Sequence, residues 1–225
     1  MKNIGVVVAM SVESEPMEKL FGRPVNEYSY GVMSIKEYSY LDKRIYFATC
    51  TEGEIMASAC TQYLISACGA ELIFNYGLAG GLTDQKLGNT LLVKGVAHYE
   101  FDISPLNGAP AGKYDRFDGT VIATDEKMRV KVKALHPEIE EVICASGDKF
   151  VADKAFKDRL VNDYGASVCE MESAGVLFTS LNAGVPQVIL KVISDNGDDA
   201  QNFVDFVREK NFEYVALIAE ILKNI

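Results

Sequence analysis

Histidine is scarce in this sequence of 225 residues, which contains only His98 and His136. Neither lies in an HExxH or similar motif, and two histidines cannot build a multi-histidine metal site. The five cysteines are odd in number and show no CxxC spacing, which is typical of reduced core thiols rather than of disulfides or zinc ligands. The sequence therefore predicts neither a metal site nor a disulfide framework.

Basic residues are also in short supply, because 22 lysines and arginines stand against 32 aspartates and glutamates. The formal net charge of -10 and the isoelectric point near 4.8 argue against a nucleic-acid partner, since phosphate binding requires a basic face. The same charge argues against an anionic membrane surface. No apolar run approaches the ~18 residues of a membrane span, and the first one is too short for a signal peptide. We therefore expect a cytoplasmic protein with neither nucleic acid nor membrane as a partner.

Low-complexity linkers and repeats of about 20–50 residues are absent too, so we expect one domain over residues 1–225. Short apolar runs alternate with segments of helical period. The predicted strands are Ile4–Val8, Arg44–Thr49, Leu72–Tyr76, Thr90–Val96, Val142–Ala145, Ser167–Glu170 and Gln187–Ile193. The predicted helices are Ser11–Leu20, Ile55–Ser66, Asp125–Leu135, Lys154–Tyr164, Ser173–Asn182 and Asn202–Lys223, the last with Phe203, Phe206, Phe212, Val215 and Ile218 near helical spacing. This alternation implies an α/β three-layer sandwich whose mixed, mostly parallel central sheet is flanked by helices.

Polar motifs follow the predicted strands, at the sheet edge where α/β proteins bind ligands. Ala9–Glu15 places Glu13 in a first helical turn, where a glutamate also suits the helix dipole. Asn75–Leu82 contains three glycines in five positions, so a ligand can approach the backbone closely. The glycine spacing differs from the dinucleotide-binding fingerprint, and no Gly-Lys-Ser/Thr follows as in a P-loop. Alone, each motif is more typical of an ordinary helix start or turn.

Three further motifs lie at the ends of the later predicted strands. Ser146–Val151 has the composition of a turn. A Cys-Glu-Met-Glu motif contains Glu170 and Glu172, which at strand spacing point to one face. Like charges this close need a reason, such as a sugar diol or a shared proton. Asp195 leaves the most hydrophobic predicted strand, which is a usual place for a catalytic acid and equally for a helix N-cap.

Together the five motifs resemble those of the methylthioadenosine/S-adenosylhomocysteine nucleosidases, and more broadly those of the purine nucleoside phosphorylase superfamily, over essentially the whole chain. The matching segments are Ala-Met-x-x-Glu, Gly-x-Ala-Gly-Gly-Leu, Ser-Gly-Asp-x-Phe, Glu-Met-Glu and Ile-Ser-Asp. The resemblance implies a nucleoside phosphorylase-like fold and cleavage of the N-glycosidic bond of a purine nucleoside, without a metal or an organic cofactor.

The resemblance also implies roles for the matching residues. Glu13 would activate the attacking water, and Asp195, steadied by Ser194, would protonate purine N7. Glu172 would bind the ribose hydroxyls, and Met171 would pack beneath the sugar. Such a set suits the reaction, because breaking the bond builds positive charge on the ribose and negative charge on the base.

Other matching positions imply contacts to the base and to the 5′ substituent. Phe150 would stack on the base, the Val151 backbone would bond its edge, and Phe203 would lie near the 5′ substituent. The remaining candidate substrate-binding residues are Leu78, Ala79, Gly80, Glu170, Glu52, Ile103 and Lys191.

Several of these positions depart from the family pattern. Leu78 stands where the nucleosidases often carry serine, and Lys191 where many carry arginine, both near the water or phosphate site. Glu52 stands near the 5′ pocket where relatives usually place an apolar residue, and a carboxylate facing a thioether is poorly compensated. Methylthioadenosine therefore need not be the preferred substrate.

Hydrolysis is favoured over phosphorolysis, because phosphate needs cationic donors and no arginine occurs before Arg23. Glu13 would also repel phosphate, whereas Lys191 is the residue that favours a phosphorylase. A hydrolase of futalosine-type nucleosides, which carry a bulky acidic or aromatic 5′ group, is an alternative, against which Glu52 argues. A non-catalytic nucleoside-binding protein is another, against which the retained catalytic carboxylates argue.

Assembly is a further implication of the resemblance. The nucleosidases are dimers in which the partner subunit helps to close the 5′ pocket. Ile103 and Leu106 match that lining, in a loop whose apolar residues suit an interface better than a solvent face. We therefore expect a homodimer.

Overall fold

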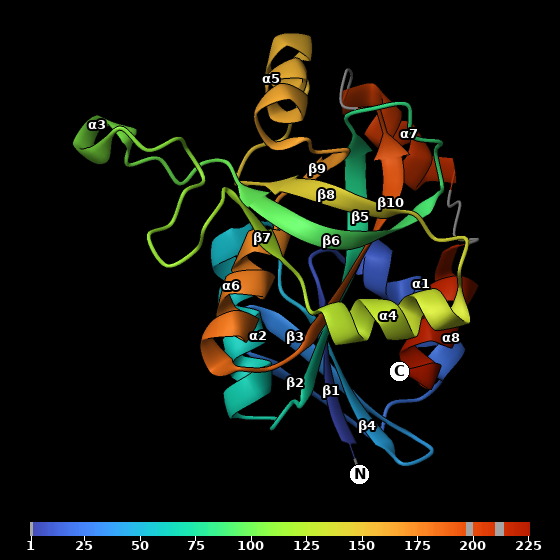
Figure 1. Cartoon of the computed structure of the whole chain (residues 1–225). Helices are drawn as coiled ribbons and strands as arrows, with labels where there is room; N and C mark the ends of the chain where they lie inside the picture. Colours follow the sequence, from blue (N-terminus) through green and yellow to red (C-terminus); the bar gives the residue numbers. More distant parts are fainter. Residues whose placement is uncertain (1, 197–199, 210–213) are drawn as a thin grey trace.

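The computed structural model describes residues 2–196, 200–209 and 214–225, and its strands pair into one mixed sheet (Figure 1). Their order is β10-β6-β8-β9-β5-β1-β4-β3-β2, with β7 paired to β6. The strands are β1 (Lys2–Val8), β2 (Asn26–Tyr30), β3 (Met33–Tyr40), β4 (Lys43–Thr49), β5 (Leu72–Gly81), β6 (Thr90–His98), β7 (Val121–Ala123), β8 (Glu141–Ser146), β9 (Val168–Glu170) and β10 (Gln187–Asp195).

Part of this sheet closes into a barrel, because β10 pairs with β5 as well as with β6. The ring β10-β6-β8-β9-β5 contains antiparallel steps at β10–β6 and at β5–β9. The predicted α/β fold with a mixed sheet is confirmed, but part of the sheet is a closed barrel, which the predicted three-layer sandwich with a mostly parallel central sheet did not include. β5 is long enough to pair with β1 at its start, with β10 along most of its length and with β9 at Gly80 and Gly81.

Helices cover both faces of the sheet, as the sequence predicts (Figure 1). The side chains of β1 show the division: Ile4, Val6 and Val8 belong to one core cluster and Val7 to the other, because alternate residues of a strand face opposite sides. The first cluster packs against α1 (Ser11–Phe21), α4 (Glu126–Leu135) and α8 (Tyr214–Asn224). The second packs against α2 (Glu54–Ser66) and α6 (Ser173–Ala183).

The end of β5 is the point at which the predicted motifs meet. Gly80 pairs with Asp195 of β10 on one side and with Cys169 of β9 on the other. The next pair along β9, Glu170 with Ser146, brings in the end of β8. Residues that are far apart in the sequence thus become neighbours through strand register alone.

All seven predicted strands are present, but the glycine-rich turn is not a turn. Gly77, Gly80 and Gly81 lie within β5 and continue its pairing with β10 and β9. The prediction missed β2, β3, β7 and the short helix α3 (Ser104–Asn107). The sequence of β2, NEYSY, is mostly exposed and polar, so it carries no apolar signal.

Five of the six predicted helices are confirmed, including α5 (Lys154–Tyr164), and the described residues of the sixth are helical as well. Within the predicted range Asn202–Lys223 the structure describes α7 (Ala200–Glu209) and α8, and residues 210–213 between them lie outside the described residues. The predicted contact at Phe212 lies outside the described residues. Phe206 of α7 and Ile218 of α8 belong to the same core cluster. None of the helices in the described part of the chain combines the length and apolar character that a membrane crossing requires.

Candidate active site

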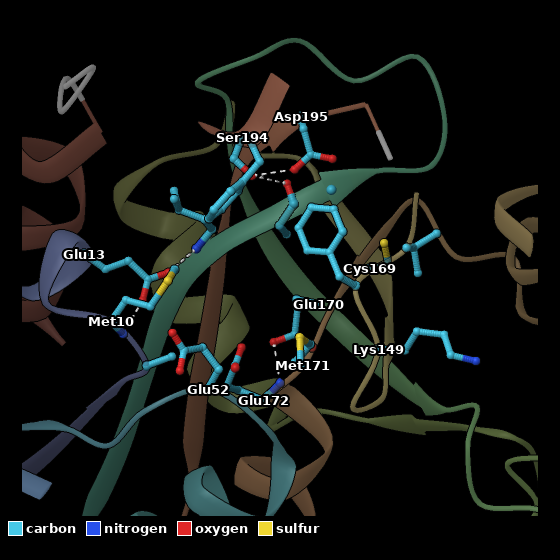
Figure 2. Close-up of a pocket in the computed structure, with 17 residues that line it drawn as sticks. Met10, Glu13, Glu52, Lys149, Cys169, Glu170, Met171, Glu172, Ser194 and Asp195 are labelled. Carbon is cyan, nitrogen blue, oxygen red and sulfur yellow. Dashed lines mark hydrogen bonds between the residues drawn. The ribbon is translucent and has the colours of Figure 1, made fainter. Parts of the chain in front are cut away.

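A cavity of about 260 Å³ opens where the predicted motifs converge (Figure 2). It is lined by Ala9, Met10, Glu13, Glu52, Leu78, Ala79, Gly80, Lys149, Phe150, Val151, Cys169, Glu170, Met171, Glu172, Ser194, Asp195 and Phe203. The structure therefore brings together every candidate residue from the sequence except Ile103 and Lys191.

Glu13 reaches the cavity from the first turn of α1. Its Oε2 accepts the backbone N–H of Met10 at 2.9 Å, and its Oε1 accepts that of Leu78 at 2.7 Å. The carboxylate thus caps its own helix while it faces the cavity, and only 3% of the residue is exposed. Burial raises the pKa of Glu13 above its ordinary value, although the two N–H donors oppose the shift.

Glycine at position 77 is what allows Glu13 to lie against β5. A Cβ atom there would stand 2.9 Å from Oε1 of Glu13, which is closer than real Cβ contacts come. The backbone of β5 therefore approaches a carboxylate of the protein itself at this point, whereas the sequence suggested an approach to a ligand.

Asp195 enters the cavity through an irregularity in β10. The register with β5 shifts between Ile193 and Asp195, so Ser194 is the extra residue of a bulge. The Ser194 hydroxyl lies 2.8 Å from Oδ2 of Asp195 and donates to it. A Cβ atom at Gly80 would stand 3.0 Å from Oδ1 of Asp195, so glycine leaves room for this carboxylate as well.

Glu170 is held by the protein on several sides. Its Oε2 forms an ion pair with Nζ of Lys191 at 2.6 Å, and both side chains are almost completely buried. The same oxygen accepts the backbone N–H groups of Glu172 and Ser173, where α6 begins. Burial works against ionisation, but the neighbouring ammonium lowers the pKa of Glu170 below its ordinary value. Glu170 thus holds the first turn of α6 as a carboxylate paired with Lys191, while it also lines the cavity.

Glu172 has a different environment, although only one residue separates it from Glu170. Its Oε1 accepts the backbone N–H of Gly53 at 2.9 Å, across from the start of α2. Burial, reinforced by the charge of Glu170, raises the pKa of Glu172 to about 8. The motif therefore supplies one carboxylate that keeps its charge and one carboxyl group that is easily protonated.

Two aromatic rings stand at the mouth of the cavity. Phe150, which is 46% exposed, meets Phe203 edge-on, with 5.8 Å between the ring centroids. Val151 is buried behind them. An exposed phenyl face beside a carboxylate is suited to stack on a planar polar ring, such as a nucleobase.

Four lining residues were not singled out from the sequence: Ala9, Met10, Lys149 and Cys169. Each lies inside a recognised motif that also contains a candidate residue, so membership of the motif was the available signal. Burial, reinforced by the charge of Asp195, raises the pKa of Cys169 to about 12, so this residue is a neutral thiol. Lys149 lies with its ammonium 5.1 Å from the ring centroid of Phe156, and Figure 2 shows it directed away from the carboxylates.

Ile103 lies elsewhere. It is part of residues 99–120, here called the arm, which project from the body and carry α3 at the tip (Figure 1). Lys191 lies behind the lining, where Glu170 holds it. Among the described residues, no group of three or more His, Cys, Asp or Glu side chains is arranged to hold a metal ion.

Comparison with known proteins shows a consistent set of relatives. The model of the phosphorylase superfamily matches residues 3–225. An aminodeoxyfutalosine nucleosidase of Helicobacter pylori is 31% identical over 93% of both chains. A methylthioadenosine/S-adenosylhomocysteine nucleosidase of Shewanella halifaxensis is 25% identical over 99% of both chains. Among solved structures, a methylthioadenosine/S-adenosylhomocysteine nucleosidase of Helicobacter pylori, complexed with a pyrrolidinol that carries an amino-pyrrolopyrimidine, has a TM-score of 0.90 at 30% identity, covering 99% of this chain and 96% of that one.

The raised pKa of Glu172 predicts a pH-dependent gain in stability for the variant Glu172→Gln. The unfolded carboxyl group loses its proton near 4.5 and the folded one near 8, so the wild-type protein loses stability between these two values. The glutamine variant has no such proton, so its free energy of unfolding relative to wild type should rise by about 1–4 kcal/mol over this window. Denaturant titrations at pH values below, within and above the window measure the difference.

Glu52→Gln removes an exposed carboxylate from the same cavity and is the matched control for that experiment. Its stability relative to wild type should change little over the same window. A difference between Glu172→Gln and wild type that stays constant with pH would contradict the raised pKa.

Proposed function

The chain belongs to the phosphorylase superfamily and, within it, to the methylthioadenosine/S-adenosylhomocysteine nucleosidase group, and we propose that it hydrolyses the N-glycosidic bond of a 5′-substituted purine nucleoside. One observation carries the proposal: Glu13 and Asp195 face one cavity from different sides, while Glu170 neutralises the buried cation Lys191 beside it (Figure 2).

In the proposed reaction Asp195 donates a proton to N7 of the purine, which makes the base a better leaving group. The bond between C1′ and N9 breaks, and its electron pair stays with the base. Glu13 orients a water molecule, whose oxygen bonds to C1′ as Glu13 accepts its proton. The free lone pairs of Glu13 suit this task, because its N–H donors fix the carboxylate without neutralising it.

The sugar is the part of the substrate that becomes positive. Glu172 accepts hydrogen bonds from the ribose hydroxyls, and Met171 packs against the ring. Carboxylates around a cavity with little water stabilise an oxocarbenium-like centre electrostatically. Phe150 stacks on the base, and Ser194 fixes the acid through its 2.8 Å hydrogen bond to Oδ2 of Asp195.

Hydrolysis is favoured over phosphorolysis by the distribution of charge. Phosphate requires several donors, and preferably cations, around its oxygens. Lys191, the residue that would support a phosphorylase, is already paired with Glu170 at 2.6 Å. Among the described residues that line the cavity, Lys149 is the remaining cation, and it is directed away from Glu13 and Glu172 (Figure 2).

We further propose a homodimer, in which the arm of one subunit helps to close the cavity of the other. Leu106 on α3 is 86% exposed at the tip of the arm. Such an exposed apolar side chain on a projecting segment suits an interface. We place the protein in the cytoplasm, since its five cysteines are all free thiols.

Product analysis tests the nature of the nucleophile. Incubation with methylthioadenosine or adenosine should release the base at the same rate with and without inorganic phosphate, because Lys191 is paired with Glu170 and Lys149, the cation among the described lining residues, is directed away from Glu13 and Glu172 (Figure 2). The sugar product should carry a free anomeric hydroxyl. Phosphate-dependent turnover that yields a sugar 1-phosphate would reverse the assignment to hydrolysis.

The variants Glu13→Gln and Asp195→Asn test the catalytic pair. Each keeps the side-chain shape but removes proton transfer, so each should lower kcat by about 10²–10⁴-fold. Circular dichroism should show an unchanged fold. Glu15→Gln is the matched control for the first variant, since Glu15 lies on the same helix but is exposed, and it should turn over normally. Near-normal turnover of Asp195→Asn would remove Asp195 as the general acid.

Sedimentation tests the proposed dimer. The wild-type protein should sediment as a dimer at micromolar concentration, and Leu106→Asp should weaken the dimer and raise KM. Val130→Asp is the matched control, because Val130 is an exposed apolar residue on α4, away from the arm. A wild-type monomer with full activity would overturn the proposed assembly.

A further inference from the structure

The segment Thr51–Glu54, here called the strap, joins three of the sequence motifs around the cavity. The backbone N–H of Thr51 donates to the carbonyl of Ala9 at 2.9 Å. The N–H of Gly53 donates to Glu172 at 2.9 Å, and that of Glu54 donates to Asp148 at 2.7 Å. Glu52 takes part in none of these three hydrogen bonds, and its side chain lines the cavity.

The backbone of the strap has a positive φ on both sides of Glu52, which is strained at Thr51 and requires glycine at Gly53. Thr51 has a φ of 77°, which is unfavourable for a β-branched residue. Gly53 has a φ of 102°, and a Cβ atom there would stand 2.9 Å from Oδ1 of Asp148. Such a conformation persists only where surrounding contacts fix it, so the position of Glu52 is fixed by the fold.

Glu52 differs from the other carboxylates of the cavity in having no partner. Met10 and Leu78 donate to Glu13, and the remaining acids bond Lys191, Gly53 or Ser194. Among the described residues, no cation lies within ion-pair distance of Glu52 and no hydrogen-bond donor reaches it. The strap thus presents an unpaired negative charge to whatever occupies the cavity.

The location of Glu52 identifies the part of the substrate that it meets. Figure 2 shows Glu52 at the same end of the cavity as Glu172, and Asp195 at the other end. The hydrogen bond from Gly53 to Glu172 confirms that the strap lies beside the sugar-binding carboxylate. If Asp195 meets the base, then Glu52 lies beyond the sugar, where the 5′ substituent projects.

We infer that Glu52 is a specificity-determining residue, which selects nucleosides whose 5′ substituent carries a positive charge or a hydrogen-bond donor. This inference rests on the proposed function. An ammonium group at ion-pair distance from a partly exposed carboxylate gains roughly three- to tenfold in relative affinity. A neutral thioether gains no affinity from the contact, and the affinity for a carboxylate falls by a similar factor.

Three adenine nucleosides that differ only at the 5′ position test the inference. They carry an ammonium group (5′-amino-5′-deoxyadenosine), a thioether (5′-methylthioadenosine) or a carboxylate (adenosine-5′-carboxylic acid). In Glu52→Gln the ratio of kcat/KM for the amine to that for the thioether should fall about three- to tenfold relative to wild type, as the lost charge contact implies. The ratio for the carboxylate to the thioether should rise by a similar factor.

The salt dependence of the kcat/KM ratios distinguishes an electrostatic role of Glu52 from a merely structural one. Raising NaCl from about 0.1 M to about 1 M shortens the Debye length from about 10 Å to about 3 Å. In the wild-type protein the ratio of kcat/KM for the amine to that for the thioether should therefore fall at high salt. In Glu52→Gln this ratio should stay the same. Glu15→Gln, which removes a nearby exposed charge outside the cavity, is the control and should behave as wild type.

The outcomes separate this inference from the proposed function. Equal ratios in wild type and Glu52→Gln would overturn the role of Glu52 even if every nucleoside is hydrolysed. If the wild-type protein releases base from none of them, the proposed function fails. In that case calorimetric Kd values for the same three nucleosides decide the role of Glu52: a shifted ratio supports it, and an unchanged ratio or no binding overturns it.

Discussion

The buried ion pair between Lys191 and Glu170 is the contact on which the arrangement of the cavity depends. It joins β10 to β9, and the carboxylate holds the first N–H groups of α6 at the same time. Removing one partner of such a pair typically costs about 3–5 kcal/mol, because the other charge is left buried and uncompensated. Since the pair fixes the charge on Glu170, the neighbouring Glu172 is the group that takes up a proton easily.

Much of the site could be predicted because its residues follow buried strands. Glu13 lies in the helix that follows β1 and Asp195 ends β10, and continuous apolar runs made both strands recognisable. The meeting of these residues could not be predicted from the runs alone. It requires Gly80 to pair with β9 and β10 together, and so requires the closed barrel that hydrophobic periodicity does not encode.

Other features of the site could not be predicted from the sequence, for different physical reasons. The partnership of Lys191 with Glu170 joins two strands that do not pair with each other, so neither register nor spacing indicates it. Met10 escaped because its backbone N–H, rather than its side-chain chemistry, makes it a partner of Glu13.

The polar, exposed sequence of β2 has a consequence for the behaviour of the protein in a crowded solution. Because barrel closure occupies the other end of the sheet, β2 is an edge where unpaired backbone groups of one molecule can meet a strand of another. Asn26 and Glu27 stand exposed there, and Glu27 lies 3.8 Å from Lys36 of the adjacent strand. Charged side chains on an edge oppose the addition of a further strand. The strand that was hardest to recognise by hydrophobicity is thus well suited to prevent aggregation.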